Sequence, residues 1–152
     1  MVSMRIEEYG LIGDTQTVAL VSNEGSIDWL CLPRVDSGAC FAALLGSSEN
    51  GRWQIAPTEH RKARSRNYRD GSLILETHFE TSTGTATLID FMPVHDGDKR
   101  VDVVRLVRGD TGTVEFRCDL TMRFDYGAVT PWVRARPDGI SALAGPDALQ
   151  LH

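Results

Sequence analysis

Residues 13–46, GDTQTVALVSNEGSIDWLCLPRVDSGACFAALLG, decide the fold of this chain. Residues 17–21 form a strand rich in β-branched side chains, and Asn23-Glu24-Gly25 follows as a turn of residues that tolerate positive φ. The returning strand, residues 26–32, is apolar on both faces beyond Asp28. A strand of this kind lies inside a fold, with layers above and below it.

The same segment continues into a loop and a predicted helix. Pro33 ends the strand because proline has no N–H to donate to a sheet, and residues 34–36 form the loop. Ser37 is a suitable N-cap for a short helix over residues 38–45, which turns its apolar side chains inward and ends at Gly46. The hairpin, the loop and the helix are expected to fold as one unit.

Short strands separated by glycine, proline and aspartate turns make up the rest of the chain. The most regular is residues 114–125, which is apolar at every even position and polar at every odd one. The other predicted strands are residues 52–56, 73–79, 85–92, 101–107 (ended by Gly109-Asp110), 131–135, 140–144 and 148–151. This spacing predicts an all-β fold, an antiparallel two-sheet β-sandwich with one short helix near residues 38–45.

Residues 25–37 carry a resemblance to a known family. They read GSIDWLCLPRVDS and resemble the start of the bacterial glycoside hydrolase family 15 proteins, the glucoamylases and their trehalase relatives. Val35 replaces the phenylalanine usual in that pattern, and Gly38 stands where proline is common. The resemblance extends over nearly the whole chain, through LILE at 73–76, DFMP at 90–93, RFDYG at 123–127 and PWV at 131–133.

The resemblance implies an N-terminal β-sandwich domain over residues 1–152. It also implies a catalytic (α/α)6 barrel downstream, in which two glutamates act as acid and base of an inverting α-glucoside hydrolase. No catalytic residue is therefore carried over to this chain. Because residues 149–151 end in mid-alternation, we expect a truncated domain whose partner is its own catalytic barrel, and whose open sheet edge allows self-association.

Composition and charge fit a single soluble domain. The chain has 152 residues and a net charge of −5, and it holds no apolar run long enough to span a membrane. Its first nine residues are polar, unlike a signal peptide. Cys31, Cys40 and Cys118 are odd in number and widely spaced, which predicts reduced, buried thiols and a cytoplasmic location.

Residues 61–69 carry five positive charges. They are consistent with a phosphate or nucleic-acid patch, but the acidic net charge and the single interleaved aromatic residue favour a charged loop or sheet edge. The run His95-Asp96-Gly97-Asp98 offers metal-ligating atoms without calcium-loop spacing or a second histidine, so a plain turn is favoured. No metal, cofactor, nucleic acid or membrane is expected as a partner.

Five aspartates stand at places of chemical interest: Asp14, Asp28, Asp36, Asp90 and Asp125. A self-contained hydrolase would need two of them as a pair, which the sequence does not supply. Turn, cap and solvated-face roles are the simpler interpretation, because aspartate is common in all three.

Three tryptophans bear on an alternative function, that of an autonomous carbohydrate-binding module. Trp29 lies in an apolar strand and belongs to the core, whereas Trp53 and Trp132 adjoin turns and are candidates for stacking on sugar rings of α-glucosides. The loop at residues 33–37 suggests a further hypothesis, in which Arg34 and Asp36 line the rim of the parent enzyme's substrate pocket. The alternative is that Arg34 and Asp36 pair with each other or cap the helix.

Overall fold

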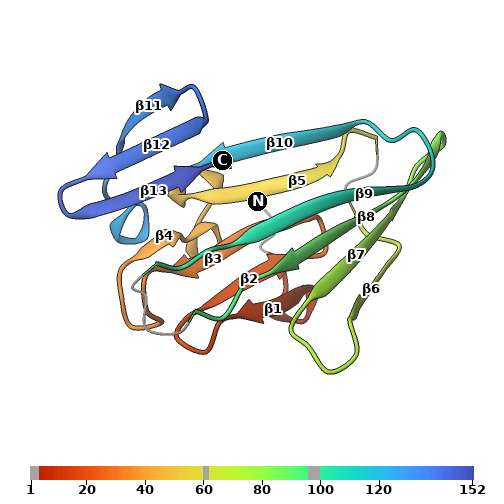
Figure 1. Cartoon of the computed structure of the whole chain (residues 1–152), viewed down its shortest axis with the longest axis horizontal. Helices are drawn as coiled ribbons and strands as arrows, with labels where there is room; N and C mark the ends of the chain where they lie inside the picture. The colour runs from red at the N-terminus through yellow and green to blue at the C-terminus, as the bar shows by residue number, and fades with distance from the viewer. Residues whose placement is uncertain (1–3, 60–61, 96–99) are drawn as a thin grey trace.

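The computed structural model describes residues 4–59, 62–95 and 100–152. In these residues the chain forms thirteen strands in three antiparallel sheets, and its only helices are four short 3-10 turns (Figure 1). The predicted all-β sandwich is therefore confirmed. Among the described residues no helix has the length and apolarity needed to cross a membrane.

The largest sheet is built around the N-terminal hairpin. Its order is β1 (Tyr9–Gly13), β2 (Val18–Ser22), β3 (Ser26–Cys31), β5 (Arg52–Pro57) and β10 (Phe116–Thr121), with β4 (Ala39–Phe41) paired to β3. The second sheet has the order β6 (Ser65–Tyr68), β7 (Leu75–Glu80), β8 (Gly84–Phe91) and β9 (Val104–Gly112). The third holds β11 (Trp132–Arg136), β12 (Gly139–Ala144) and β13 (Asp147–Leu151).

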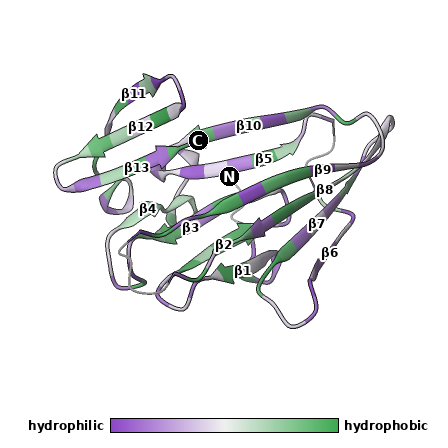
Figure 2. Ribbon diagram, in the orientation of Figure 1, coloured by the Kyte–Doolittle hydropathy of each residue, from purple (hydrophilic) through white to green (hydrophobic). Residues whose placement is uncertain are grey.

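One hydrophobic core joins the three sheets. The first sheet supplies Ile12, Ile27 and Leu30, the second Leu75, and the third Ala142, all at most 2% exposed. Figure 2 shows the difference between an inner and an edge strand, since β8 is mainly apolar and β6 mainly polar. The buried strands thus carry the apolar residues, as the hydrophobic effect requires.

The predicted hairpin of the first segment is confirmed, and Gly25 explains its tight turn. Gly25 has φ +68°, and a Cβ atom there would lie 2.3 Å from the carbonyl oxygen of Ile55. Both the left-handed backbone and the close approach of β5 favour glycine at this position.

The predicted helix over residues 38–45 is wrong. Residues 39–41 instead form β4, in which Leu30 faces Phe41 and Cys31 faces Ala39, and only Ala43–Leu45 makes a 3-10 turn. Leu45 is 66% exposed rather than buried. An eight-residue helix has little stability of its own, so pairing with the available edge of β3 outweighs local propensity.

Two strand predictions need correction. β9 continues through Gly109-Asp110, because Asp110 is the extra residue of a β-bulge and the pairing with β8 resumes beyond it up to Gly112. The regular strand at 114–125 is shorter, with β10 ending at Thr121. The aperiodic basic stretch contains β6, the edge strand of the second sheet, in keeping with the expected charged edge.

Cys118 is exposed, contrary to the prediction of three buried thiols. It lies on β10, which has a neighbouring strand on one side only, so the sheet covers its side chains less completely. Cys31 and Cys40 are buried as predicted, and burial raises the pKa of the Cys40 thiol to about 12.

Candidate functional site

The loop after Pro33 is closed by its own polar groups. Arg34 Nε lies 2.9 Å from Asp36 Oδ1, and Arg34 Nη2 lies 3.3 Å from Asp36 Oδ2. The backbone N–H of Arg34 donates to Ser37 Oγ at 3.2 Å, and the N–H of Ser37 donates to the Arg34 carbonyl at 3.0 Å. Arg34 and Asp36 thus pair with each other, the alternative recognised from the sequence, and Ser37 holds the loop instead of capping a helix.

The Arg34–Asp36 pair faces solvent. The two side chains are 64% and 67% exposed, and the hydrogen bond from Arg34 lowers the pKa of the Asp36 carboxyl. A forked guanidinium with one carboxylate partner keeps further donors for a ligand or a neighbouring domain. A role for these two residues at a substrate pocket stays a prediction.

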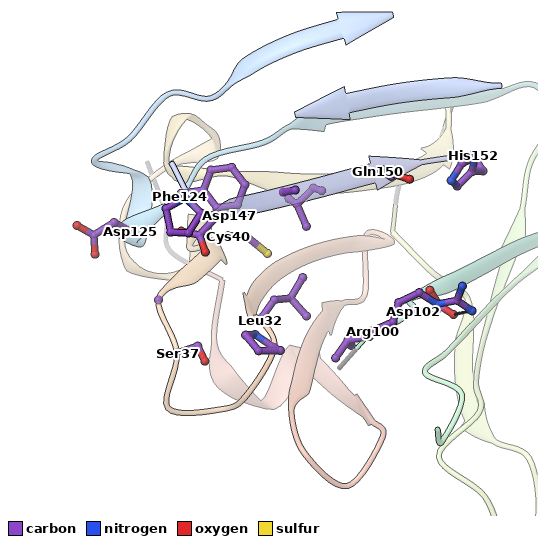
Figure 3. Close-up of a pocket in the computed structure, with 16 residues that line it drawn as sticks. Leu32, Ser37, Cys40, Arg100, Asp102, Phe124, Asp125, Asp147, Gln150 and His152 are labelled. Carbon is purple, nitrogen blue, oxygen red and sulfur yellow. Dashed lines mark ion pairs between the residues drawn. The ribbon is translucent and has the colours of Figure 1, made fainter. Parts of the chain in front are cut away.

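A cleft of about 1010 Å³ opens beside this loop. Pro33, Ser37 and Gly38 line one part of it, and β13 lines another. Figure 3 shows Asp125 and the pair Arg100–Asp102 at opposite sides of this cleft, with Ser37 and Leu32 between them. Arg34 and Asp36 lie outside the lining of this cleft.

Asp102 is the most constrained acid of the cleft. Arg100 Nη2 lies 2.9 Å from Asp102 Oδ2, and His95 Nε2 lies 3.1 Å from the same oxygen. The Arg100 guanidinium thus fixes the position of the Asp102 carboxylate in the lining of the cleft.

Three of the five singled-out aspartates have turn or surface roles, as predicted, and one of them is Asp125, which is exposed at the start of the 3-10 turn η4 (Asp125–Gly127). Asp14 Oδ1 accepts the backbone N–H groups of Gln16 and Thr17, both at 2.9 Å, which fixes the β1–β2 turn. Asp36 is the exposed partner of Arg34.

Asp28 and Asp90 do not fit the turn, cap or surface interpretation, because both are buried. Asp28 accepts hydrogen bonds from the Tyr9 hydroxyl at 2.8 Å and the Ser26 hydroxyl at 2.5 Å. Burial, followed by the charge of Asp28, raises the pKa of Tyr9 well above its usual value. The Asp28 carboxylate therefore has a structural role, since both of its oxygens accept hydrogen bonds inside the sandwich.

Asp90 forms an ion pair with Arg105, whose importance the sequence analysis missed. Arg105 Nε lies 2.8 Å from Asp90 Oδ1, and neither side chain has any exposed surface. Arg105 also donates to the carbonyls of Trp53 at 2.5 Å and Gly25 at 2.8 Å, so it ties β9 to the opposite sheet. In the sequence, Arg105 lies on the same strand face as the apolar residues Val101 and Val103, and this pattern could have predicted that its side chain is buried.

The two candidate tryptophans differ in their surroundings. Trp53 packs against the core, donates its indole N–H to Cys118 Sγ at 3.4 Å, and lies 5.1 Å beneath the Arg105 guanidinium. Trp132 is 62% exposed, with the Arg134 guanidinium 4.4 Å over its ring. Trp132 therefore remains the better candidate for stacking on a sugar, whereas Trp53 is occupied by packing.

Three of the four described basic side chains in this stretch form ion pairs within the chain. Lys62 lies 3.6 Å from Glu8, Arg64 pairs with Glu80, and Arg69 lies 2.6 Å from Glu76. Arg66 donates to the carbonyl of Val21 at 3.0 Å. Such internal pairing favours the interpretation of a charged sheet edge over that of a phosphate-binding patch.

Two sequence features fall partly outside the described residues. Arg61 of the basic stretch lies there, as do Asp96, Gly97 and Asp98 of the suggested metal loop. Within residues 4–59, 62–95 and 100–152, no cluster of three histidine, cysteine, aspartate or glutamate side chains could hold a metal ion.

Comparison with known proteins identifies the family. Residues 2–152 match the family model described as "Trehalase-like, N-terminal". The chain belongs to the trehalase-like N-terminal domain family.

Several curated trehalases are similar to this trehalase-like N-terminal domain. It is 35% identical to the trehalase of Mycolicibacterium smegmatis over 91% of this chain and 23% of that protein. It is 37% identical to trehalase 1 of Sulfolobus acidocaldarius over 88% of this chain and 22% of that protein. The domain thus spans about a fifth of the length of these relatives. No solved structure gives a significant match.

Proposed function

We propose that this chain is the non-catalytic N-terminal sandwich of a trehalase-type glycoside hydrolase of family 15. In this proposal the sandwich folds with the catalytic barrel and shapes it, and the barrel hydrolyses an α-glucoside with inversion. The match over residues 2–152 to the trehalase-like N-terminal family, together with the small share of the relatives that it covers, carries the proposal.

The geometry of the acids supports a non-catalytic role. Inverting hydrolysis needs two carboxyl groups about 6.5–9.5 Å apart, with room for a water between them. Asp28 and Asp90 are buried within hydrogen-bond and ion-pair networks, so a substrate does not reach them.

A chimera tests the proposal against a known enzyme. The matching N-terminal part of the Mycolicibacterium smegmatis trehalase would be deleted, and in a second protein it would be replaced by this chain. We expect this chain alone to release no glucose from trehalose or maltose, the deleted trehalase to lose activity, and the chimera to recover some of it. Full activity of the deleted trehalase would refute a shaping role, and hydrolysis by this chain alone would refute its non-catalytic character.

The loop at residues 33–37 gives the proposal a residue-level form, in which Arg34 and Asp36 project toward the barrel and border its substrate pocket. In the full-length protein, Arg34→Ala should raise KM or lower kcat while leaving Tm nearly unchanged, because an exposed ion pair contributes little stability. Arg117→Ala is the matched control, since Arg117 pairs with Asp119 at 2.7 Å with the same spacing in sequence and is 65% exposed. Equal kcat and KM values for the two variants would mean that the loop has a structural role only.

A second function, carbohydrate binding by the isolated domain, is favoured by Trp132. An exposed indole on a strand whose five residues are all exposed is a suitable platform for a sugar ring. Titration with trehalose, maltose and soluble starch would detect binding, and Trp132→Ala should abolish it. The absence of any binding would leave the shaping role as the function of the domain.

A further inference from the structure

An apolar groove of about 610 Å³ borders the loop at residues 33–37 through Val35, and its lining shares no residue with that of the polar cleft. Its walls are the β1–β2 turn and Val35 on the side of the first sheet, and, on the side of the second, the segment before β7 and the end of β8 with the residues that follow it. It lies where the two sheets end together, so residues distant in sequence meet there.

The groove exposes large apolar side chains close together, although contact of apolar surface with water is unfavourable. Val35 is 57% exposed, Leu73 is 50% exposed and Val94 is 65% exposed. Its floor includes Met92, which is 5% exposed. Although charged residues make up 24% of the chain, the groove lining contains none. Depletion of charge around exposed apolar residues is the compositional mark of an interface core.

Hydrogen bonds preform the groove on the side of the first sheet. The backbone N–H of Val35 donates to the carbonyl of Gln16 at 3.1 Å, which joins the loop to the β1–β2 turn. Asp14 fixes that turn, and the Thr17 hydroxyl donates to the carbonyl of Cys31 at 2.6 Å. A wall held this firmly binds a partner with little loss of conformational entropy.

We propose that this groove, with Val35, Leu73 and Val94 at its centre, is the docking surface for the remaining polypeptide of the parent trehalase. The occupant is an uncharged segment that inserts apolar side chains between the two sheets. This inference rests on the proposed function, because it requires the rest of the parent protein. It also assigns the loop a double role, in which Val35 anchors the interface while Arg34 and Asp36 reach beyond it.

Two observations favour this occupant over a second copy of the chain. The curated relatives extend over roughly four to five times the length that this chain matches, so a large partner is covalently at hand. The groove is also bordered by three stretches that carry the family resemblance, residues 33–37, 73–76 and 90–93. A symmetric dimer would place one concave groove against another, which leaves both unfilled.

Cysteine labelling of the full-length protein tests the docking surface. Cys118→Ser removes the thiol that is exposed in this domain, and Val35→Cys, Leu73→Cys and Leu45→Cys are then introduced singly, with the variant lacking an introduced cysteine as the background. Leu45 is the control, because it is 66% exposed in this domain and lies outside the groove. We expect maleimide to label the two groove positions about tenfold or more slowly than position 45, as buried sites react only through local opening.

Equal labelling rates at all three positions in the folded full-length protein would overturn the proposal. Slow labelling that becomes fast on dilution, as a dimer separates into monomers, would assign the groove to a second copy and would also overturn it. Slow labelling of a monomeric protein at every concentration is the supporting result. The two proposals fail in different experiments. Full activity of a trehalase that lacks this domain would refute the proposed function. The labelling rates test only the docking surface, because they do not depend on activity.

Discussion

Replacement of Arg105 should be among the most destabilising single changes in this domain. Arg105→Met leaves the Asp90 carboxylate without its cationic partner at a site where the side chain has no exposed surface. Breaking a buried pair from one side costs about 3–5 kcal/mol, because an uncompensated charge stays buried. The carbonyl of Trp53 loses a donor as well, whereas the carbonyl of Gly25 keeps the N–H of Ile55 at 3.0 Å.

Arg108→Met on the same strand is the matched control. Arg108 pairs with Asp110 at 2.8 Å, but its side chain is 53% exposed, and such pairs contribute about 0–1 kcal/mol. The free energy of unfolding would be measured by urea denaturation at neutral pH, with tryptophan fluorescence as the signal because Trp53 lies beneath Arg105.

The double variant Asp90→Leu with Arg105→Met separates the buried charge from other causes. Removing both charges should recover much of the lost stability, since apolar replacements of buried pairs are often neutral or favourable. The reasoning fails if Arg105→Met costs less than about 1 kcal/mol, or if the double variant loses the sum of the two single losses. Either result would mean that the pair is hydrated or that packing alone explains the loss.

Three further predictions concern the core, the thiols and the pH dependence. Phe79→Ala should cost about 3–5 kcal/mol in urea denaturation, because Phe79 is 1% exposed and its removal leaves a cavity; a cost below about 1 kcal/mol would contradict the packing. Ellman's reagent should modify Cys118 in the native chain and the two buried thiols only after unfolding; fast reaction of all three would contradict the burial. Hydrogen bonds from Thr87 and then Arg108 lower the pKa of Asp110, so its stabilising contribution is complete above the unfolded-state pKa and is lost as pH falls through the lowered value. Asp110→Asn should therefore reduce the urea midpoint at neutral pH and lose its effect in acid, and a constant difference across pH would contradict the assignment.

The sequence by itself determined the fold class and the family. The β2–β3 hairpin, its turn at Gly25 and the hairpin of β7 and β8 follow from alternation and turn chemistry, which act between neighbours in the chain. The stretch GSIDWLCLPR and the pieces at 73–76 and 90–93 pointed to the trehalase-like family, which the family model then confirmed.

Only the tertiary structure decided features in which distant residues meet. Residues 39–41 form β4 because Leu30 and Cys31 of β3 lie beyond its pairing with β5, and that vacant position is invisible in the local pattern ACFAALL. Asp90 and Arg105 become a buried pair, and Arg105 reaches the opposite sheet, only when β8 and β9 lie side by side under β5. The groove around Val35 and Leu73 likewise exists because the ends of both sheets coincide. Local sequence encodes the conformation of each strand, whereas burial, ion pairs and docking surfaces depend on which strands pack together.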